Sequence, residues 1–246
     1  MSNKVAYVTG GMGGIGTAIC QQLARDGIRV VAGCGPKSPR KDKWLAEQKA
    51  LGFDFVASEG NVSDWDSTKA AFDKVKAEDG EIDVLVNNAG ITKDGVFRKM
   101  SVEDWMAVID TNLNSLFFVT KQVVDGMMER GWGRIINISS MNGQRGQFGQ
   151  TNYSTAKAGM HGFSMALAQE VASKGVTVNT VSPGYIGTDM VRAIREDVLE
   201  KIVATIPVRR LGEPDEIASI VGWLASDKAG FTTGANFACN GGNYMT

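Results

Sequence analysis

Short apolar runs recur along the chain, and longer segments of mixed polarity separate them. The apolar runs are VAYV (5–8), IRVVAG (28–33), FDFVAS (53–58), IDVLVNN (82–88), RIINIS (134–139), VTVNTV (176–181) and NFACNG (236–241). Such short, nearly unbroken runs are typical of strands buried on both faces, whereas the segments between them have helical spacing. The pattern predicts a single-domain α/β protein over 1–246, with one doubly wound parallel sheet of about seven strands and helices on both faces.

The first predicted strand leads through a glycine-rich turn directly into a helix, within YVTGGMGGIGTAI (7–19). Gly10, Gly14 and Gly16 would let backbone amides approach a pyrophosphate at the positive end of that helix. A turn of this kind can also lack a ligand, but its place after the first strand favours nucleotide binding. We therefore expect a Rossmann-type fold, with a cofactor half at about 1–135 and a catalytic and substrate half at about 136–246.

The segment after the second predicted strand bears on the choice of nucleotide. An NAD site usually has an acidic residue about 20 positions after the glycines. This chain has GCGPKSPRKDK (33–43) there, and Asp42 comes too late. The basic side chains near Gly35 are Lys37, Arg40, Lys41 and Lys43. Such cations suit the 2'-phosphate of NADP, with Arg40 as the first candidate and Lys41 as the second, and a solvated basic loop is the alternative.

Composition and charge restrict the class of partner. The chain has 30 glycines without a repeat, so glycine is used at particular sites. A net charge of −1 argues against binding to nucleic acids and membrane surfaces, which require a positive field. Three cysteines without CxxC spacing and one histidine predict neither a disulfide framework nor a metal site. No leader-like or membrane-spanning stretch is readable, so we expect a cytoplasmic protein that binds small molecules.

A tyrosine and a lysine stand four positions apart in NYSTAK (152–157). On a helix over about 152–173, Tyr153 and Lys157 would be stacked on a core-facing stripe, where an unpaired ammonium group is costly. A nearby cation would favour the phenolate and move the tyrosine pKa toward neutral pH. Ser140 ends the fifth predicted strand, where sheets of this class bind ligands. A core tyrosine beside a snorkelling lysine is the alternative.

Several motifs occur together in one order. They are TGGMGGIG (9–16), NNAG (87–90), Asn112 in DTNL, Ser140, YSTAK (153–157) and SPGYIGTDM (182–190). In this combination the chain resembles the classical short-chain dehydrogenase/reductase family over nearly its whole length. The resemblance implies that Tyr153 donates a proton to a substrate carbonyl, that Ser140 hydrogen-bonds the same oxygen, and that Lys157 holds the nicotinamide ribose and lowers the tyrosine pKa. It assigns Asn112 to a water-linked proton relay.

The resemblance also implies contacts with a nicotinamide dinucleotide, expected here to be NADPH or NADP. The residues are Gly10, Met12, Gly14, Ile15, Gly16, Gly35, Arg40, Asn61, Val62, Asn88, Ala89, Gly90, Tyr153, Lys157, Pro183, Gly184, Ile186 and Thr188. Two positions depart from the family pattern, because many relatives have aspartate at position 61 and a basic residue at Gly13. The 2'-phosphate assignment therefore depends more heavily on Arg40.

Within the family, the segments 7–19 and 142–163 look most like the acetoacetyl-CoA reductases of polyhydroxybutyrate and related polyhydroxyalkanoate synthesis. The resemblance implies reduction of a short 3-oxoacyl-CoA to the (R)-3-hydroxyacyl-CoA. The expected substrate contacts are Ser140, Gln147, Gln150, Tyr153 and Tyr185. Each glutamine has a solvated loop residue as its alternative. A lid at about 185–212 would exclude water, and Arg192 and Arg195 are candidates for the CoA phosphates.

Two other functions remain open at this point. One is a reductase for carrier-protein thioesters or for a small alcohol, and the other is a non-catalytic nucleotide-binding module. The complete set of Ser140, Tyr153 and Lys157 counts against the second. The polar loop before the tyrosine has Phe148 as its only large apolar side chain, which favours a short acyl group.

Small residues recur at every fourth position beside the catalytic stripe. They are Ser154, Ala158, Gly162 and Ala166. A flat helix face of this kind allows another helix to approach closely, either within the chain or from a second copy. The family resemblance favours a second copy and implies a homotetramer.

Overall fold

The computed structural model describes residues 4–245, and its seven strands form one parallel sheet. The strands are β1 (Val5–Val8), β2 (Arg29–Cys34), β3 (Val56–Glu59), β4 (Ile82–Asn87), β5 (Gly133–Ile138), β6 (Val176–Pro183) and β7 (Asn236–Cys239). The predicted α/β class and parallel sheet are therefore confirmed. The third strand begins later than predicted, at Val56; before it, Phe53 and Phe55 stack on each other, and the second ring also stacks on Trp44 of the neighbouring helix.

The strand order explains where a ligand site can form. The order is β3-β2-β1-β4-β5-β6-β7, and β1 pairs with β2 on one side and with β4 on the other. The direction of winding reverses between β1 and β4, so the connections after these strands lead to opposite faces of the sheet. Such a switch point leaves a crevice outside the carboxyl ends of the strands.

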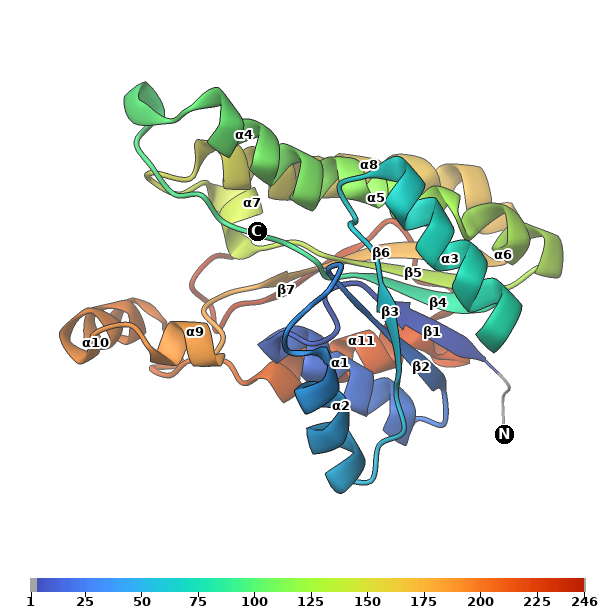
Figure 1. Ribbon diagram of the computed structural model, residues 1–246. Helices are drawn as coiled ribbons and strands as arrows, with labels where there is room; N and C mark the ends of the chain where they lie inside the picture. The colour runs from blue at the N-terminus through green and yellow to red at the C-terminus, as the bar shows by residue number, and fades with distance from the viewer. Residues whose placement is uncertain (1–3, 246) are drawn as a thin grey trace.

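Helices cover both faces of the sheet. These helices are α1 (Gly14–Arg25), α2 (Lys41–Ala50), α3 (Trp65–Asp79), α4 (Val102–Ile109), α5 (Ser115–Lys121), α6 (Val124–Arg130), α7 (Met141–Arg145), α8 (Thr151–Val171) and α11 (Pro214–Ala225). Two further helices, α9 (Asp189–Arg192) and α10 (Glu196–Thr205), lie away from the sheet. Figure 1 shows α1, α2 and α11 below the sheet and α3, α5, α6 and α8 above it. No helix within residues 4–245 is long and apolar enough to cross a membrane.

Each helical layer has its own apolar core against the sheet. Ile19, Leu23 and Leu224 belong to the core between the sheet and helices α1 and α11. Phe72 and Met127 belong to the core on the opposite face. The burial of β1 and β4 from both sides explains why their sequences are nearly continuous apolar runs rather than alternating ones.

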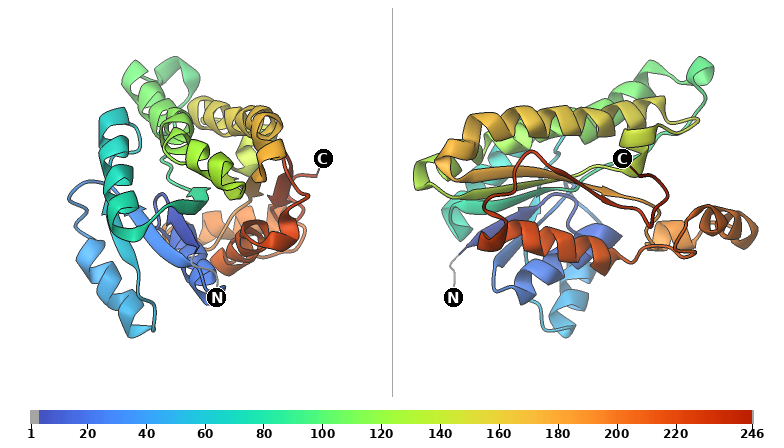
Figure 2. Two further views of the ribbon diagram at one scale, coloured as in Figure 1. Left: turned by 90° about the vertical axis from the view of Figure 1, so that its right-hand side faces the viewer. Right: turned by 180° about the vertical axis from the view of Figure 1, so that it is seen from behind.

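The segment that carries α9 and α10 projects from the carboxyl edge of the sheet (Figures 1 and 2). Its two ends are joined, since the Gly187 amide donates to the Gly212 carbonyl over 2.7 Å and the Gly212 amide donates to the Tyr185 carbonyl over 2.9 Å. Helix α10 has no buried residue. We call 185–212 the projecting segment; it is anchored at its base and exposed beyond it.

A π-helical turn, η2 (Asp110–Asn114), connects α4 and α5. It places the side chain of Asn112 in the interior, where the residue is fully buried. The local sequence reads as an ordinary helix, so its periodicity did not predict this turn. Turns of this type redirect side chains and often lie at functional sites.

The glycine that precedes β6 gives a test of the packing between two loops. Gly175 has a φ of 75°, and a Cβ atom there would lie 2.1 Å from the Gly131 carbonyl oxygen. Gly27 has a similar φ of 80°, but a Cβ atom there would meet nothing within 4 Å. Gly27→Ala should cost about 1–2 kcal/mol of unfolding free energy, from backbone strain alone. Gly175→Ala should cost at least about 2 kcal/mol more, because the clash is with backbone. Urea denaturation measures both free energies, and equal costs would show that the approach of the two loops does not limit stability.

Candidate active site

A cavity of about 560 Å³ lies at the carboxyl edge of the sheet. Its walls come from the β1–α1 turn, the ends of β4, β5 and β6, helix α8 and the base of the projecting segment. The volume is typical of a site for a small molecule. The predicted residues that line it are Gly10, Gly14, Ile15, Gly16, Arg40, Asn88, Ala89, Gly90, Ser140, Tyr153, Lys157, Pro183, Gly184, Tyr185, Ile186 and Thr188.

The β1–α1 turn fits a dinucleotide because side chains are excluded from it. A Cβ atom on Gly16 would lie 2.2 Å from the Gly10 carbonyl oxygen, and one on Gly14 would lie 2.7 Å from the Thr188 side chain. Gly10 itself has a φ of 61°, which favours glycine. No side chain caps the start of α1. The first amides of this helix therefore face the cavity, where a phosphate group would satisfy them.

The end of β4 holds the same turn in place. The Asn88 side chain donates to the Thr9 and Gly10 carbonyls over 3.0 and 3.1 Å. In return, the Thr9 hydroxyl accepts from the amides of Asn88 and Ala89 over 2.9 and 3.0 Å. Sequence reasoning had singled out Asn88 but not Thr9, whose role depends on a strand 79 residues away.

The basic side chains in the segment after β2 contact different groups. Arg40 lines the cavity, and within residues 4–245 its guanidinium group has no ion pair. Lys41 binds Glu59 over 2.6 Å, and this hydrogen bond raises the pKa of the lysine and lowers that of the glutamate. Lys43 lies 3.7 Å from Glu47 on its own helix. Lys37 has no ion pair within residues 4–245 either, but it is not part of the cavity lining, so Arg40 is the unpaired cation of the segment that reaches the cavity.

Some predicted cofactor residues lie outside the cavity wall. Met12 is 6% exposed and belongs to the core beneath α1, and Gly35 has nothing within 4 Å of an added Cβ atom. Asn61 accepts hydrogen bonds from the Ser63 amide and hydroxyl over 3.2 and 2.8 Å. The neighbouring Val62 packs against the opposite core. None of these four residues is part of the cavity lining.

The strand end of β5 brings Ser140, Tyr153 and Lys157 together. Lys157 is 4% exposed, and its ammonium group donates to the Ile138 carbonyl over 2.8 Å. The ammonium nitrogen lies 5.6 Å from the centre of the Tyr153 ring. Ser140 forms a hydrogen bond with the tyrosine and also caps α7, accepting from the Asn142 amide over 3.1 Å. A serine, a tyrosine and a lysine thus face one cavity.

The electrostatics of this group differ from the sequence-based expectation. Burial raises the pKa of Tyr153; the hydrogen bond with Ser140 opposes this effect, and the Asp94 carboxylate adds to it. Burial also lowers the pKa of Lys157 to about 7. The predicted lowering of the tyrosine pKa is therefore wrong for the chain by itself, because desolvation dominates and the lysine is only partly charged at neutral pH. At neutral pH the tyrosine keeps its proton.

Asn112 lies behind the cavity wall. Its side-chain oxygen accepts from the Ile91 amide over 2.8 Å, and its side-chain nitrogen donates to the Ile91 carbonyl over 2.9 Å. A Cβ atom on Gly90 would lie 3.3 Å from that oxygen and 3.5 Å from the Lys157 nitrogen. Both atoms therefore lie on the side of Gly90 where a side chain would project, and the absence of that side chain lets them come near each other.

The predicted substrate residues are placed differently from one another. Tyr185 lines the cavity, whereas Gln150 is held between two side chains. It accepts from Asn142 and donates to Asp94, over 2.9 Å in each case. Gln147 accepts from Arg145 over 3.4 Å and lies in an exposed loop. Sequence reasoning missed Asp94, since nothing local indicated a partner 56 residues away.

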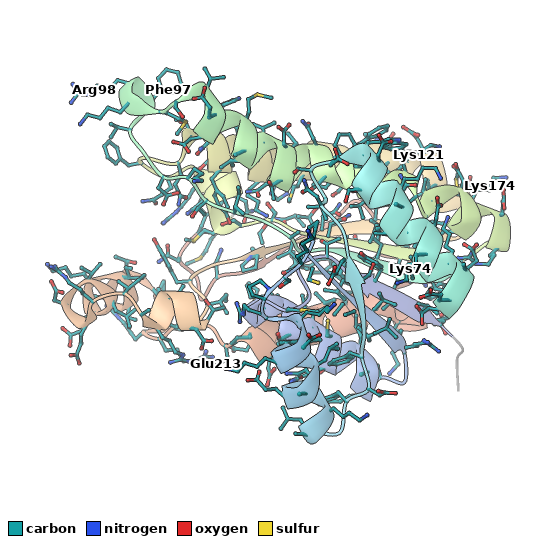
Figure 3. The ribbon with its side chains drawn as sticks, in the orientation of Figure 1. Lys74, Phe97, Arg98, Lys121, Lys174 and Glu213 are labelled. Carbon is teal, nitrogen blue, oxygen red and sulfur yellow. The ribbon has the colours of Figure 1, made fainter. Side chains whose placement is uncertain are left out.

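The two arginines proposed for CoA phosphates are engaged within the chain. Arg192 donates to both carboxylate oxygens of Glu213 over 2.9 Å and to the Gly187 carbonyl over 2.9 Å. Arg195 binds Asp197 over 2.9 Å. Figure 3 places Glu213 where the projecting segment joins the body of the protein. The Arg192–Glu213 pair anchors the segment, whereas the Arg195–Asp197 pair lies within it. Neither arginine is a free cation as the sequence suggested.

Comparison with known proteins agrees with this arrangement. A family model described as short chain dehydrogenase matches residues 4–199. The chain is 78% identical over 245 residues to an acetoacetyl-CoA reductase of Cupriavidus necator, and the match covers 100% of both chains. It is 60% identical over 246 residues to nodulation protein G of Azospirillum brasilense, again over 100% of both.

A carrier-protein enzyme is also similar. The 3-oxoacyl-[acyl-carrier-protein] reductase FabG of Escherichia coli is 46% identical over 242 residues, which cover 98% of each chain. The family model spans the glycine turn, the end of β4 and the serine, tyrosine and lysine described above. The chain belongs to the short-chain dehydrogenase family, as the motifs predicted.

Proposed function

We propose that this protein is an NADPH-dependent oxidoreductase that reduces acetoacetyl-CoA and other short 3-oxoacyl-CoA thioesters to the (R)-3-hydroxyacyl-CoA, in polyhydroxybutyrate synthesis. The observation that carries the proposal is the meeting of Ser140, Tyr153 and Lys157 at a cavity that also contains a dinucleotide-type glycine turn. The full-length similarity to acetoacetyl-CoA reductases favours a CoA ester over the carrier-protein ester.

The proposed chemistry assigns one task to each side chain. The bound nicotinamide supplies a hydride to the 3-oxo carbon. The Ser140 hydroxyl donates a hydrogen bond to the carbonyl oxygen, and the Tyr153 hydroxyl transfers its proton to that oxygen as the C–H bond forms. The tyrosine enters the reaction protonated, as a general acid must, but the pKa that burial raises makes it a weaker proton donor, so the lysine and the bound cofactor would have to stabilise the phenolate. The Lys157 ammonium group would stabilise the resulting phenolate and bind the nicotinamide ribose.

The asparagine in the π-helical turn is proposed to act behind the lysine. Asn112 holds the Ile91 backbone with both polar atoms of its side chain, and its oxygen and the Lys157 nitrogen both lie beside the open side of Gly90. A proton returning to Tyr153 would pass through the lysine and waters near this asparagine. We therefore propose a relay role for Asn112, whose side chain is held in a fixed position by its hydrogen bonds to the Ile91 backbone.

We propose NADPH as the preferred cofactor because of Arg40. Its guanidinium group lines the cavity, whereas the neighbouring Lys41 is paired with Glu59. A guanidinium group binds phosphate oxygens through charge-assisted hydrogen bonds. The end of β2 carries no carboxylate for a ribose 2'-hydroxyl, and the acidic Glu59 at the end of β3 is neutralised by the lysine.

We also propose a cytoplasmic homotetramer. Ala158, Gly162 and Ala166 are exposed on α8, and a Cβ atom on Gly162 would meet nothing within 4 Å. The face is therefore open at these three positions, whereas at its fourth position, Ser154, the hydroxyl is buried within the chain. A groove of about 550 Å³ lies beside it and is lined by residues such as Phe117 and Leu167. A second copy of α8 and its neighbours would fit such a surface.

The substrate proposal predicts an order of catalytic efficiency. With NADPH, kcat/KM should be higher for acetoacetyl-CoA than for the matching carrier-protein thioester. It should fall as the acyl chain lengthens beyond about six carbons, because the loop before Tyr153 offers few apolar side chains for a longer trough. Steady-state kinetics with purified protein measure both. A higher efficiency with the carrier-protein ester would instead assign the protein to fatty-acid synthesis.

The proton-donor role predicts the behaviour of Tyr153→Phe. The variant keeps the ring and removes the hydroxyl, so kcat should fall by about 10²–10⁴-fold while the Kd for NADPH changes little. Tyr7→Phe is the matched control, because it removes a buried hydroxyl that binds Ser58 over 3.1 Å outside the cavity. The control should keep its kcat. A Tyr153→Phe variant with more than about a third of the wild-type kcat would rule out general acid catalysis by this group.

The cofactor proposal predicts a selective effect of Arg40→Ala. The KM for NADPH should rise by about 10- to 100-fold, while the KM for NADH changes less than about twofold, because only NADPH has the 2'-phosphate. Lys43→Ala is the control, since it removes a cation of the same segment that pairs with Glu47 instead. Steady-state kinetics with the two cofactors provide the measurement. Equal losses with both would make Arg40 a solvated residue of the loop.

A further inference from the structure

Three consecutive residues at the end of β5 contact helix α8, and the middle one has no assigned role. The Ile138 carbonyl accepts from the Lys157 ammonium group over 2.8 Å. Ser140, two positions later, forms the hydrogen bond with Tyr153. Between them, the Ser139 hydroxyl donates to the backbone carbonyl of Lys157 over 2.8 Å. The strand end therefore contacts the helix at three successive points.

A histidine completes the middle contact. The Nε2 atom of His161 lies 3.2 Å from the Ser139 oxygen. The serine gives its only hydrogen to the Lys157 carbonyl, so it must accept at this second contact, and Nε2 must carry the hydrogen. Burial lowers the pKa of His161, so the ring is neutral at pH 7 and keeps this arrangement. The serine is thus bound to two residues one helical turn apart.

The backbone of the serine is fixed independently. The Ser139 amide donates to the Val181 carbonyl of β6 over 2.7 Å, and the residue is 4% exposed. The position of its hydroxyl group is therefore fixed by the sheet. On the other side, a Cβ atom on Gly143 of α7 would lie 2.7 Å from the Lys157 carbonyl carbon, which shows how closely α7 packs on the same turn. Little free space is left for this turn of α8 to move.

We propose that Ser139 and His161 are positioning residues that fix the height of α8 against the end of β5, and thereby place Tyr153 and Lys157 for the reaction. We call this pair the clasp. The inference rests on the proposed function, because it takes Tyr153 and Lys157 as the groups that meet substrate and cofactor. The clasp acts through the backbone of α8, and the groups that meet substrate and cofactor belong to Tyr153 and Lys157. A displacement of about 1 Å at such groups can cost up to about 10²-fold in rate.

The test compares variants that break the clasp with one that rebuilds it. Ser139→Ala removes both hydrogen bonds of the serine hydroxyl and His161→Leu removes one of them, and kcat for acetoacetyl-CoA should fall by about 10- to 100-fold in each variant. The Kd for NADPH, measured by fluorescence without substrate, should rise several-fold, because Lys157 lines the cofactor cavity. His161→Gln keeps an N–H donor at a similar reach and should retain wild-type kcat within about threefold. The double variant should be no worse than the worse single variant, since the two groups act as one unit.

Ser58→Ala is the matched structural control. It removes a similarly buried hydroxyl of β3, which accepts from the Tyr7 hydroxyl over 3.1 Å and does not touch α8. At a comparable loss of Tm, this variant should keep kcat and the NADPH Kd near wild type. Equal losses of kcat and cofactor binding in Ser58→Ala and Ser139→Ala would overturn the proposal in favour of a general loss of rigidity.

The two readouts separate the clasp from the proposed function. A wild-type protein that binds NADPH but reduces no 3-oxoacyl thioester would refute the function, and the NADPH Kd of the variants would still decide the clasp. Active wild-type protein with unchanged kcat and Kd in both Ser139→Ala and His161→Leu would refute the clasp alone. If Ser139→Ala does not fold, His161→Leu still gives the answer, because its ring is only half-buried.

Discussion

The burial of one ammonium group is the constraint on which the active-site structure depends. Lys157 is 4% exposed and is held by the neutral carbonyl of Ile138 rather than by a carboxylate. Burying a cation with so weak a partner is unfavourable, and for this reason its pKa falls to about 7. The position of the charge follows the position of α8 relative to β5. Every contact that fixes this helix therefore also fixes the charge at the bottom of the cavity.

A buried polar network beneath α8 contributes to this fixation. Ser164 accepts from Asn137 and Thr180 over 2.8 Å each, and it donates to the Met160 carbonyl over 2.7 Å. Asn137 in turn accepts from Asn87 over 2.8 Å. The network thus ties the helix to β4, β5 and β6 at once. Because its members are paired with one another, it specifies one arrangement of helix and sheet, which an apolar contact surface would define less sharply.

The opposite wall of the cavity is built on a different principle. In the β1–α1 turn the backbone itself lines the cavity. Glycines are required there because a side chain on Gly14 would clash with Thr188 and one on Gly16 would clash with the Gly10 carbonyl. The side chain of Asn88 holds this turn from behind through hydrogen bonds to its carbonyls. Rigid backbone on one side and a fixed helix on the other leave the projecting segment as the exposed wall. Its ion pair between Arg192 and Glu213 lies at its base.

The sequence by itself determined the sheet, its helices, the glycine turn and the common face of Tyr153 and Lys157. These follow from local rules, because burial on both faces produces short apolar runs and helical spacing aligns positions four apart. Only the tertiary structure decided that Lys41 pairs with Glu59, that Asn112 lies in a π-helical turn, and that the tyrosine pKa rises. Ion pairing and desolvation depend on groups brought together from distant parts of the chain, and their balance is set by the packed interior, which no local pattern describes.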